Sequence, residues 1–244
     1  MNDRSEKFRN LLVPVLSVVL GLILGAILMA AFGFQPIQGY SSMLDAALGS
    51  QRGIGETLRQ ATPLIFTALG FSVANSAGFF NIGLSGQALC GWIVSVWVAL
   101  AFPDLPKVVL LPLCVILGAL AGAMAAAVPG LLRAFFGTSE VIVTIMMNYI
   151  LLYVSTFALH EVMPESYRSS LDSSNMISQN ASLRLPWLTQ AFGGSRVNSG
   201  LFLAIIALIF VWLLMKKTTL GFEIRSVGLN PFASEYAGMS SKRT

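Results

Sequence analysis

Charged side chains are scarce in this sequence: they make up only 11% of its 244 residues, against 55% for apolar side chains. Soluble domains usually carry about 25% charged residues, and without them a folded chain of this length cannot cover its surface for water. The shortage of charge also comes with too much apolar sequence for intrinsic disorder. With a mean hydropathy of +0.76, the composition predicts an all-α polytopic membrane protein embedded in membrane lipid.

Residues that perform chemistry are equally few. His160 is the only histidine, so the chain cannot assemble a histidine-based metal cluster. Cys90 and Cys114 lie within apolar runs, where thiols behave as small hydrophobic groups. The sequence has no G-x-x-x-x-G-K-[ST] loop for binding nucleotide phosphates. We therefore expect no catalytic residue, no metal and no cofactor, and we expect another subunit to supply the energy for any uphill transport.

Six apolar runs are candidates for membrane-spanning helices, because a hydrocarbon core of ~30 Å requires roughly 20 helical residues. A cleaved signal peptide is the alternative for the first run, although its apolar part is usually only about 7–15 residues long. Gly118 and Gly122 form a pair of small residues that lets a neighbouring helix approach closely. The runs, which predict about six spans within one transmembrane domain over residues 1–244, are Leu11–Phe34, Ala61–Ala77, Phe79–Phe102, Val108–Val128, Val141–His160 and Ser199–Leu214.

Basic residues carry an orientation signal. The formal net charge is +4, but Lys and Arg lie mostly near the ends of apolar runs and not among aromatic residues, which argues against a nucleic-acid partner. An excess of Lys and Arg marks the cytoplasmic side of a membrane protein. With the N-terminus inside, that excess falls on the inner segments, as at Arg4, Lys7, Lys216 and Lys217. We therefore expect a cytoplasmic N-terminus.

The first of three informative polar segments is Asn75–Gln87, where glycines, amides and hydroxyls interrupt apolar sequence. The backbone groups that a broken helix frees are tolerated at membrane depth only where they line a cavity or reach water. Asn81 or Ser85 can cap the following helix, so that backbone N–H groups face a polar solute. Two interpretations stay open: a tight cytoplasmic turn between spans, or a break in mid-membrane.

The second segment begins at Ser139, a suitable helix N-cap, followed by an acidic first turn. Glu140, Thr144 and Asn148 are spaced i, i+4, i+8, so they form one polar stripe along a helix. At 1.5 Å per residue, Asn148 lies ~12 Å deeper in the membrane than Glu140. Side chains of this kind either contact a solute or form hydrogen bonds with a neighbouring helix.

The third segment, residues 216–240, follows the last apolar run. Its pattern predicts a turn at Gly228, an N-cap at Asn230 and a short helix over Pro231–Ala237. Gly238 is a natural stop for that helix. Such a helix suits docking into a partner's groove, and an ordinary amphipathic connector on the membrane surface is the alternative.

In this order, the three segments resemble the permease subunits of bacterial ABC importers, in the family shared by branched-chain amino acid, monosaccharide and nucleoside systems. Ser85 stands where the nucleoside branch often has Glu, which bears on the identity of the solute, and Ser234 stands where the third segment often has Ala. The likeness covers most of the chain. The stretches most similar to the nucleoside branch are F-N-I-G-x-x-G-Q at Phe80–Gln87, S-E-V-I-x-T-I-M-x-N-Y-I at Ser139–Ile150 and T-x-x-G-x-x-I-R-x-V-G-x-N-P at Thr218–Pro231.

The resemblance implies a helical permease of the bacterial plasma membrane that imports nucleosides or a related small polar solute by alternating access. It implies three protein partners: an ABC ATPase subunit, a second permease subunit and an extracytoplasmic solute-binding protein. Members of the family usually continue with further spans, so we expect a chain that ends at Thr244 to be a truncated form.

Two sets of site residues follow from this interpretation. We predict that the solute path is lined by Asn81, Gln87, Glu140, Thr144 and Asn148. We predict that residues 216–240 form a cytoplasmic coupling segment that contacts the ATPase, with contributions from Glu223, Arg225, Gly228, Asn230, Pro231, Glu235 and Gly238.

Two other classes of function fit the same composition. A gradient-driven secondary transporter or channel would need no ATPase, so co-purification of an ATPase, or an ATPase gene beside this one, discriminates against it. A non-transporting membrane scaffold predicts no solute-dependent activity at all.

Overall fold

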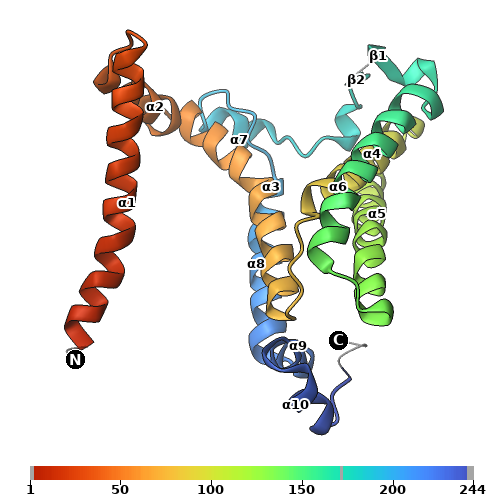
Figure 1. Cartoon of the computed structure of the whole chain (residues 1–244). Coiled ribbons are helices and arrows are strands. Elements are labelled where there is room, and N and C mark those ends of the chain that lie inside the picture. Colours follow the sequence, from red (N-terminus) through yellow and green to blue (C-terminus); the bar gives the residue numbers. More distant parts are fainter. Residues whose placement is uncertain (1–2, 171–172, 241–244) are drawn as a thin grey trace. The chain divides into compact units, whose positions relative to one another are not determined.

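The computed structural model describes residues 3–170 and 173–240, and this part of the chain is almost entirely helical (Figure 1). The all-α class predicted from composition is confirmed. The described residues contain one small antiparallel pair of strands, β1 (Arg168–Ser170) and β2 (Ser173–Ser174). The α-helices are α1 (Asp3–Ala31), α2 (Pro36–Leu48), α3 (Gln51–Ser76), α4 (Leu84–Ala101), α5 (Lys107–Phe136), α6 (Glu140–Phe157), α7 (Pro186–Ala191), α8 (Gly200–Lys217), α9 (Thr219–Leu229) and α10 (Pro231–Tyr236).

Five helices of the described part are long and apolar enough to cross a membrane, where the sequence predicted about six spans. A π-helical turn, Ala158–Val162, continues α6 and extends its candidate span to 23 residues. The predicted second span, Ala61–Ala77, is helical within α3 but is not among the five. Arg59 and Gln60 precede its apolar part directly and polar residues end it, so the uninterrupted apolar stretch is too short. The five candidate spans are Leu12–Ala31, Leu84–Ala101, Lys107–Phe136, Glu140–Val162 and Gly200–Lys217.

Several element boundaries differ from those predicted. Helix α4 begins at Leu84 and not at Phe79, because residues 79–83 form the connection from α3. Helix α5 continues through Pro129 to Phe136, where Gly137 ends it with a left-handed backbone (φ +63°). A proline inside a spanning helix is tolerated because neighbouring groups satisfy the carbonyl that it frees. Helix α2 and the short elements between residues 161 and 198 have no counterpart in the predicted spans.

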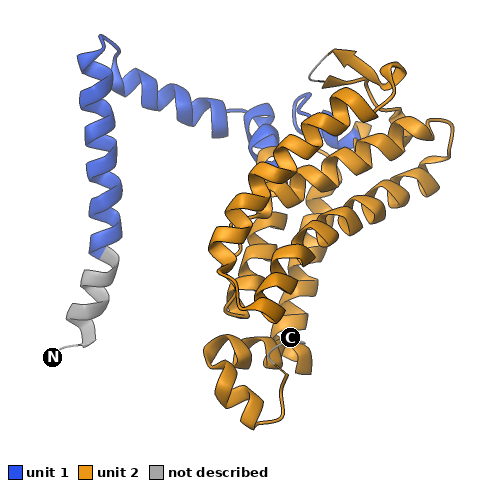
Figure 2. Cartoon of the chain, turned by 45° about the vertical axis from the view of Figure 1, so that its right-hand side comes forward, with its two compact units in different colours: residues 1–58, 187–197 blue, residues 59–186, 198–244 orange. Residues whose placement is uncertain are grey.

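The chain forms two compact units, coloured separately in Figure 2. The first comprises residues 1–58 and 187–197. Within it, Tyr40 of α2 donates a hydrogen bond to the Leu22 carbonyl of α1 (2.7 Å). The Glu56 carboxylate accepts hydrogen bonds from the Arg196 backbone N–H (2.7 Å) and the buried Ser195 hydroxyl (3.2 Å). These bonds attach α2 to α1 and the start of α3 to the segment after α7.

The second unit comprises residues 59–186 and 198–244, and α4, α5 and α6 pack together within it (Figure 1). Helices α4 and α5 approach at Gly118, where an added Cβ would lie 3.0 Å from the Gly91 carbonyl oxygen and would collide with Ser95 Oγ. The Ser95 hydroxyl donates to the Cys114 carbonyl (2.9 Å) across the same interface. An added Cβ at Gly122 would lie 3.3 Å from the Gln87 carbonyl oxygen. The close helix approach predicted from the Gly118–Gly122 spacing is confirmed.

Helix α3 meets the α8–α9 region at both of its ends within the second unit. An added Cβ at Gly200, the first residue of α8, would lie 3.5 Å from Thr62 Cγ2. At the other end, an added Cβ at Gly228 of α9 would lie 2.9 Å from the Gly78 nitrogen. Helices α3 and α8 therefore run in the same direction. This places the connection between α3 and α4 at the end of the unit where α8 finishes with Lys216 and Lys217.

Candidate functional site

The connection between α3 and α4 is a tightly bonded turn, which we call the α3–α4 turn (residues 76–83). Helix α3 ends in a Schellman motif: the Phe79 N–H donates to the Ala74 carbonyl and the Gly78 N–H to the Asn75 carbonyl, both at 3.0 Å. Gly78 has a left-handed backbone (φ +74°), which glycine adopts without steric cost. The segment is therefore a closed turn between two separate helices.

Asn81 and Gln87 form a buried amide pair inside the turn. Asn81 Nδ2 donates to Gln87 Oε1 (3.1 Å), and Gln87 Nε2 donates to Asn81 Oδ1 (3.3 Å). Asn81 Oδ1 also accepts from the Gly83 N–H (2.8 Å). Both side chains are less than a tenth exposed. Their polar atoms therefore form hydrogen bonds with each other and with the backbone instead of with water.

Two residues of the predicted α6 stripe hold the turn from the opposite side. The Ile82 N–H donates to Thr144 Oγ1 (3.2 Å), while Thr144 itself is fully buried. Asn148 Nδ2 donates to the Ile82 carbonyl (2.9 Å), and Asn148 Oδ1 accepts from the Gly86 N–H (2.9 Å). The helix-to-helix hydrogen bonding that was one alternative for this stripe is therefore present.

Capping of α4 differs from the expectation. Gly83, and not Asn81 or Ser85, occupies the N-cap position of α4, and no side chain at that position forms a capping hydrogen bond. The Ser85 side chain is exposed. Asn148 supplies the cap from another helix instead, by accepting from the first-turn N–H of Gly86. A local sequence pattern cannot reveal such a cap, because the acceptor lies 62 positions away in the chain.

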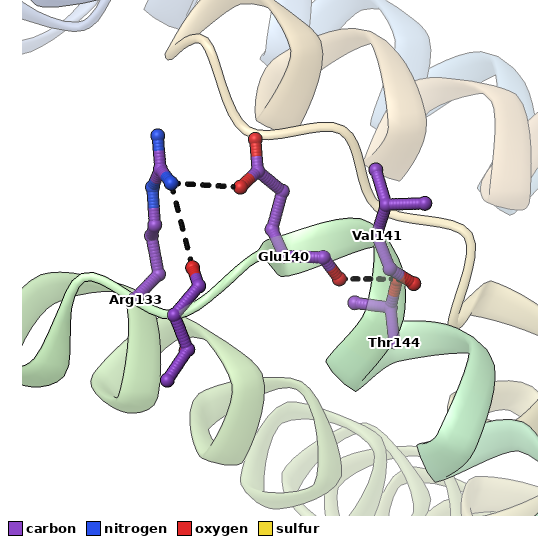
Figure 3. A network of polar contacts seen from close by, with 5 residues as sticks. Arg133, Glu140, Val141 and Thr144 are labelled. Carbon is purple, nitrogen blue, oxygen red and sulfur yellow. Dashed lines mark hydrogen bonds and ion pairs between the residues drawn. The ribbon is translucent and has the colours of Figure 1, made fainter.

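Glu140, the first residue of the stripe, is paired with a base. Arg133 Nη1 lies 3.0 Å from Glu140 Oε2, and the same guanidinium donates to the Thr138 carbonyl (Figure 3). The Glu140 side chain is 16% exposed, whereas that of Arg133 is 47% exposed. Ser139 occupies the N-cap position of α6 as predicted, but its side chain makes no capping hydrogen bond. The ion pair joins the end of α5 to the start of α6.

A small open pocket lies beside the Asn148 contacts. Its volume is about 170 Å³, and its lining is mostly apolar. The amide of Asn148 borders it with one N–H and one oxygen lone pair beyond those used by the turn, and the exposed Ser85 hydroxyl lies at the same rim. The lining residues are Ser85, Gly86, Leu89, Asn148, Tyr149 and Leu152. The pocket thus offers a few polar groups on an apolar wall, and its volume is below the roughly 300–1,000 Å³ of typical small-molecule sites.

The structure therefore brings four of the five predicted path residues into one cluster at the α3–α4 turn: Asn81, Gln87, Thr144 and Asn148. Glu140 lies one turn away from Thr144 on α6 and faces Arg133 (Figure 3). Sequence reasoning missed the backbone groups of Ile82 and Gly86, which bind the stripe directly. It also missed Leu89 and Tyr149, whose apolar character resembles that of the rest of their helices.

The predicted coupling segment folds as two short helices, α9 and α10. Thr218 Oγ1 accepts from the Gly221 N–H (3.1 Å) and caps α9. Asn230 Oδ1 accepts from the Ala233 N–H (3.1 Å), and Pro231 opens α10. Gly238 follows α10 with a left-handed backbone (φ +84°). The predicted cap, proline start and glycine stop are confirmed.

The turn predicted at Gly228 is wrong, because Gly228 lies in the last turn of α9. Its small size is needed for close approach: an added Cβ would collide with the Ser76 carbonyl oxygen of the α3–α4 turn and lie 2.9 Å from the Gly78 nitrogen. In the same helix, Arg225 Nε donates to the Gly221 carbonyl (3.2 Å), and Glu223 is half-buried. Ser234 is buried, while Glu235 is exposed.

Three large apolar side chains project from the end of α9 and from α10 into open space. Leu229 is 88% exposed, Phe232 is 77% exposed and Tyr236 is 96% exposed. We call these three residues the apolar tip. Exposed large apolar side chains outside the apolar spans are typical of a surface that another protein or the membrane covers.

The comparisons with known proteins agree on one family. A family model described as "Branched-chain amino acid transport system / permease component" matches residues 53–244. The nucleoside ABC transporter permease protein NupB of Lactococcus lactis is 53% identical over 242 residues, which are 98% of this chain and 66% of that protein. The guanosine ABC transporter permease protein NupP of Bacillus subtilis is 41% identical over 98% of this chain and 67% of its own length.

A more distant relative is a sugar permease: the glucose ABC transporter permease protein TsgB13 of Haloferax volcanii is 34% identical over 93% of this chain and 60% of its own length. The chain thus spans about two thirds of the length of these curated relatives or slightly less. No solved structure matches the chain.

The contact between Thr144 and the α3–α4 turn predicts a measurable effect on stability. Thr144→Val removes the acceptor of the Ile82 N–H and leaves that group unpaired, which should cost about 1–3 kcal/mol. Thr144→Ser keeps an oxygen in place and should restore most of the loss. The measurement is the thermal unfolding midpoint of the purified chain in detergent.

Thr156→Val is the matched control, because the exposed Thr156 hydroxyl bonds only the Leu152 carbonyl of its own helix. Equal shifts for Thr144→Val and Thr156→Val would show that the Ile82 bond contributes nothing to stability.

Proposed function

Because the chain belongs to the family of branched-chain amino acid transport system permease components, we propose that it is a membrane-spanning subunit of an ATP-driven importer for nucleosides. The family model covers residues 53–244, so the resemblance carried by the three motifs is confirmed. The chain is a multi-pass membrane protein of this family, with five helices of its described part apolar enough to span. The observation that carries the proposal is 53% identity, over 98% of the chain, to a nucleoside ABC permease.

Nucleosides are the solute class that the relatives favour. Two of the relatives above are named for nucleoside and guanosine transport, and the one named for glucose transport is less similar. The pocket beside Asn148 agrees with a small polar solute, because it offers an amide and a hydroxyl on an apolar wall. Apolar and aromatic side chains such as Leu89 and Tyr149 suit the face of a planar base, and the polar groups suit hydrogen bonds to it.

The coupling role of residues 216–240 is supported by the position of the apolar tip. Lys216 and Lys217 end the last candidate span, and basic residues there favour the cytoplasmic side. The apolar tip follows directly and is exposed. A partner ATPase that covers Leu229, Phe232 and Tyr236 would bury apolar surface at about 25 cal/mol per Å². The same orientation puts the α3–α4 turn on the cytoplasmic side. A cytoplasmic N-terminus further requires that α3, which is not among the five candidate spans, also crosses the membrane.

The remaining partners follow from the mechanism proposed. A permease of this kind works with a second permease subunit, which completes the solute path, and with an extracytoplasmic binding protein that delivers the solute. Alternating access then exposes the path to each side in turn, powered by ATP hydrolysis on the separate ATPase subunit.

Uptake by the assembled system tests the function directly. Cells that lack their own nucleoside importers should accumulate radiolabelled guanosine when they express this chain with its ATPase, second permease and binding protein. Uptake should stop when the ATPase is inactivated and should survive collapse of the proton gradient while ATP is maintained. The opposite pattern would assign the chain to the gradient-driven transporters, and no solute-dependent activity would assign it to the scaffolds.

Cross-linking tests the coupling surface. Single cysteines at Ala233, Tyr236 and Gly238 should cross-link to the ATPase subunit in native membranes, because the described part of the chain leaves these positions exposed. Cysteines placed between Glu161 and Asn198 serve as the matched control and should not react with the ATPase. Cross-links from the control positions alone would overturn both the orientation and the coupling assignment.

The role of Asn148 in the solute path predicts a specific uptake defect. Asn148→Leu removes the free donor and acceptor at the pocket, so uptake should fall roughly tenfold, the effect of losing about 1.4 kcal/mol of interaction. The solute concentration for half-maximal uptake should rise, which distinguishes solute contact from a loss of protein. Met146→Leu, a change at an exposed apolar position of the same helix, is the control. Normal uptake by Asn148→Leu at normal abundance would reduce Asn148 to a packing residue.

A further inference from the structure

The coupling segment touches the α3–α4 turn through bare backbone. An added Cβ at Gly228 would collide with the Ser76 carbonyl oxygen and would come within 2.9 Å of the Gly78 nitrogen. In the reverse direction, an added Cβ at Gly78 would lie 3.3 Å from the Gly228 Cα and 3.4 Å from the Gly228 oxygen. Two main chains therefore rest against each other with no side chain between them. A movement of α9 toward the turn cannot be absorbed by a change of rotamer at this contact.

The turn that receives this contact is stiff. The Schellman bonds fix residues 74–79, and the glycine at its corner has the left-handed conformation that the motif requires. Just beyond, the Phe80 ring packs edge-on against Phe71 of α3, with centroids 5.4 Å apart and planes at 80°. The two hydrogen bonds between the Asn81 and Gln87 amides then hold the end of the turn against the first turn of α4. Packed elements of this kind are displaced as bodies and do not deform continuously.

The far end of the turn is fixed to the pocket. Thr144 and Asn148 bind Ile82 and Gly86 through three hydrogen bonds of 2.9–3.2 Å. The approach is again close, because an added Cβ at Gly86 would lie 3.0 Å from the Asn148 Cα and 3.1 Å from Leu151 Cδ1. Gly86 and Asn148 line the pocket themselves. A displacement of the turn therefore reaches the pocket wall through direct contacts.

We propose that the α3–α4 turn is the joint between the coupling segment and the pocket, with Gly228 as its input contact and Asn148 as its output contact. The proposal rests on the proposed function and deepens it, because it names the route by which an ATPase docked at the apolar tip moves the solute path. The coupling is reciprocal, as any coupling between two binding sites must be. Solute in the pocket biases the position of α9, just as the ATPase biases the position of Asn148.

Gly228→Ala tests the input contact with the smallest possible intrusion. The full chain is expressed with its partner subunits, and four quantities are measured: abundance in the membrane, co-purification of the ATPase, solute-stimulated ATP hydrolysis and guanosine uptake. Co-purification of the ATPase per molecule of permease should be unchanged, since the apolar tip is intact, and the two activities are normalised to abundance. Uptake should fall roughly tenfold, within the usual range of coupling effects, and ATP hydrolysis should no longer respond to solute.

Gly130→Ala is the matched control, because it adds the same methyl group to a helical glycine that has no atom within 4 Å of an added Cβ. It should leave all four quantities unchanged. If Gly228→Ala showed the same uptake and the same ATP hydrolysis as Gly130→Ala, the proposed joint would be overturned.

A double-mutant cycle tests whether Gly228 and Asn148 belong to one route. If the joint carries the motion, Gly228→Ala and Asn148→Leu break the same connection, and uptake by the double variant should match that of the worse single variant. Independent sites would instead give a loss equal to the product of the two single losses. That product would overturn the joint, while leaving each residue with a separate role.

Thiol labelling separates a failure of the joint from a failure of the proposed function, because it needs no ATPase. A cysteine at the exposed Ser85 reports on the pocket rim, and its labelling rate in membranes is measured by mass spectrometry of the peptide. Gly228→Ala should change that rate, and Gly130→Ala should not. Equal rates overturn the joint, even if the chain associates with an ATPase. A changed rate in a chain that associates with no ATPase overturns the proposed function alone.

The reverse measurement decides the case in which Gly228→Ala does not accumulate. A cysteine at Leu229, which is 88% exposed and adjacent to the contact, is labelled in the presence and absence of Asn148→Leu. Reciprocity requires Asn148→Leu to change this rate. An unchanged rate would overturn the joint.

Discussion

The structure depends on one constraint: backbone N–H and C=O groups inside an apolar medium must find partners within the protein. Between α3 and α4 the chain leaves the helix, which frees backbone groups from helical hydrogen bonds. The Ile82 N–H and carbonyl and the Gly86 N–H are instead bonded by Thr144 and Asn148. The polar stripe of α6 therefore supplies hydrogen-bond partners for the segment between α3 and α4, and that segment supplies partners for the polar side chains of the stripe. Without either one, buried polar groups of the other would lose their partners, which costs free energy.

The same constraint accounts for the use of glycine at this end of the second unit. Hydrogen bonds from a side chain on one helix to the backbone of another require the two backbones to lie close together. Gly86 lies against the Asn148 Cα, and Gly228 lies against the Ser76 and Gly78 backbone. The close packing that pairs the polar groups also leaves little room for one element to move independently of its neighbour. In the proposed joint, such contacts carry a movement of α9 to the pocket wall, because no flexible side chain lies between the two main chains to absorb it.

At this end of the second unit, the charged residues and the exposed apolar residues have different roles. Arg133 and Glu140 join α5 to α6 by an ion pair at the border of the span, where partial burial of Glu140 protects the pair from solvent screening. Leu229, Phe232 and Tyr236 are left uncovered, and they suit a partner that buries apolar surface. The 53% identical nucleoside permease and the 34% identical glucose permease indicate that one scaffold serves polar solutes of different shape.

The sequence by itself determined the membrane class, most of the spans, the family and the local structure of the coupling segment. Apolar runs, the Asn230–Pro231 cap and the Gly238 stop are short-range signals, and short-range physics suffices to interpret them. The i, i+4, i+8 spacing also identified Glu140, Thr144 and Asn148 as one face of a helix. Only the tertiary structure decided what that face binds: Asn148 caps α4 across 62 positions, and Gly228 packs on a turn about 150 positions earlier in the chain. Pairings between distant segments depend on how whole helices pack, and no local pattern in the sequence records them.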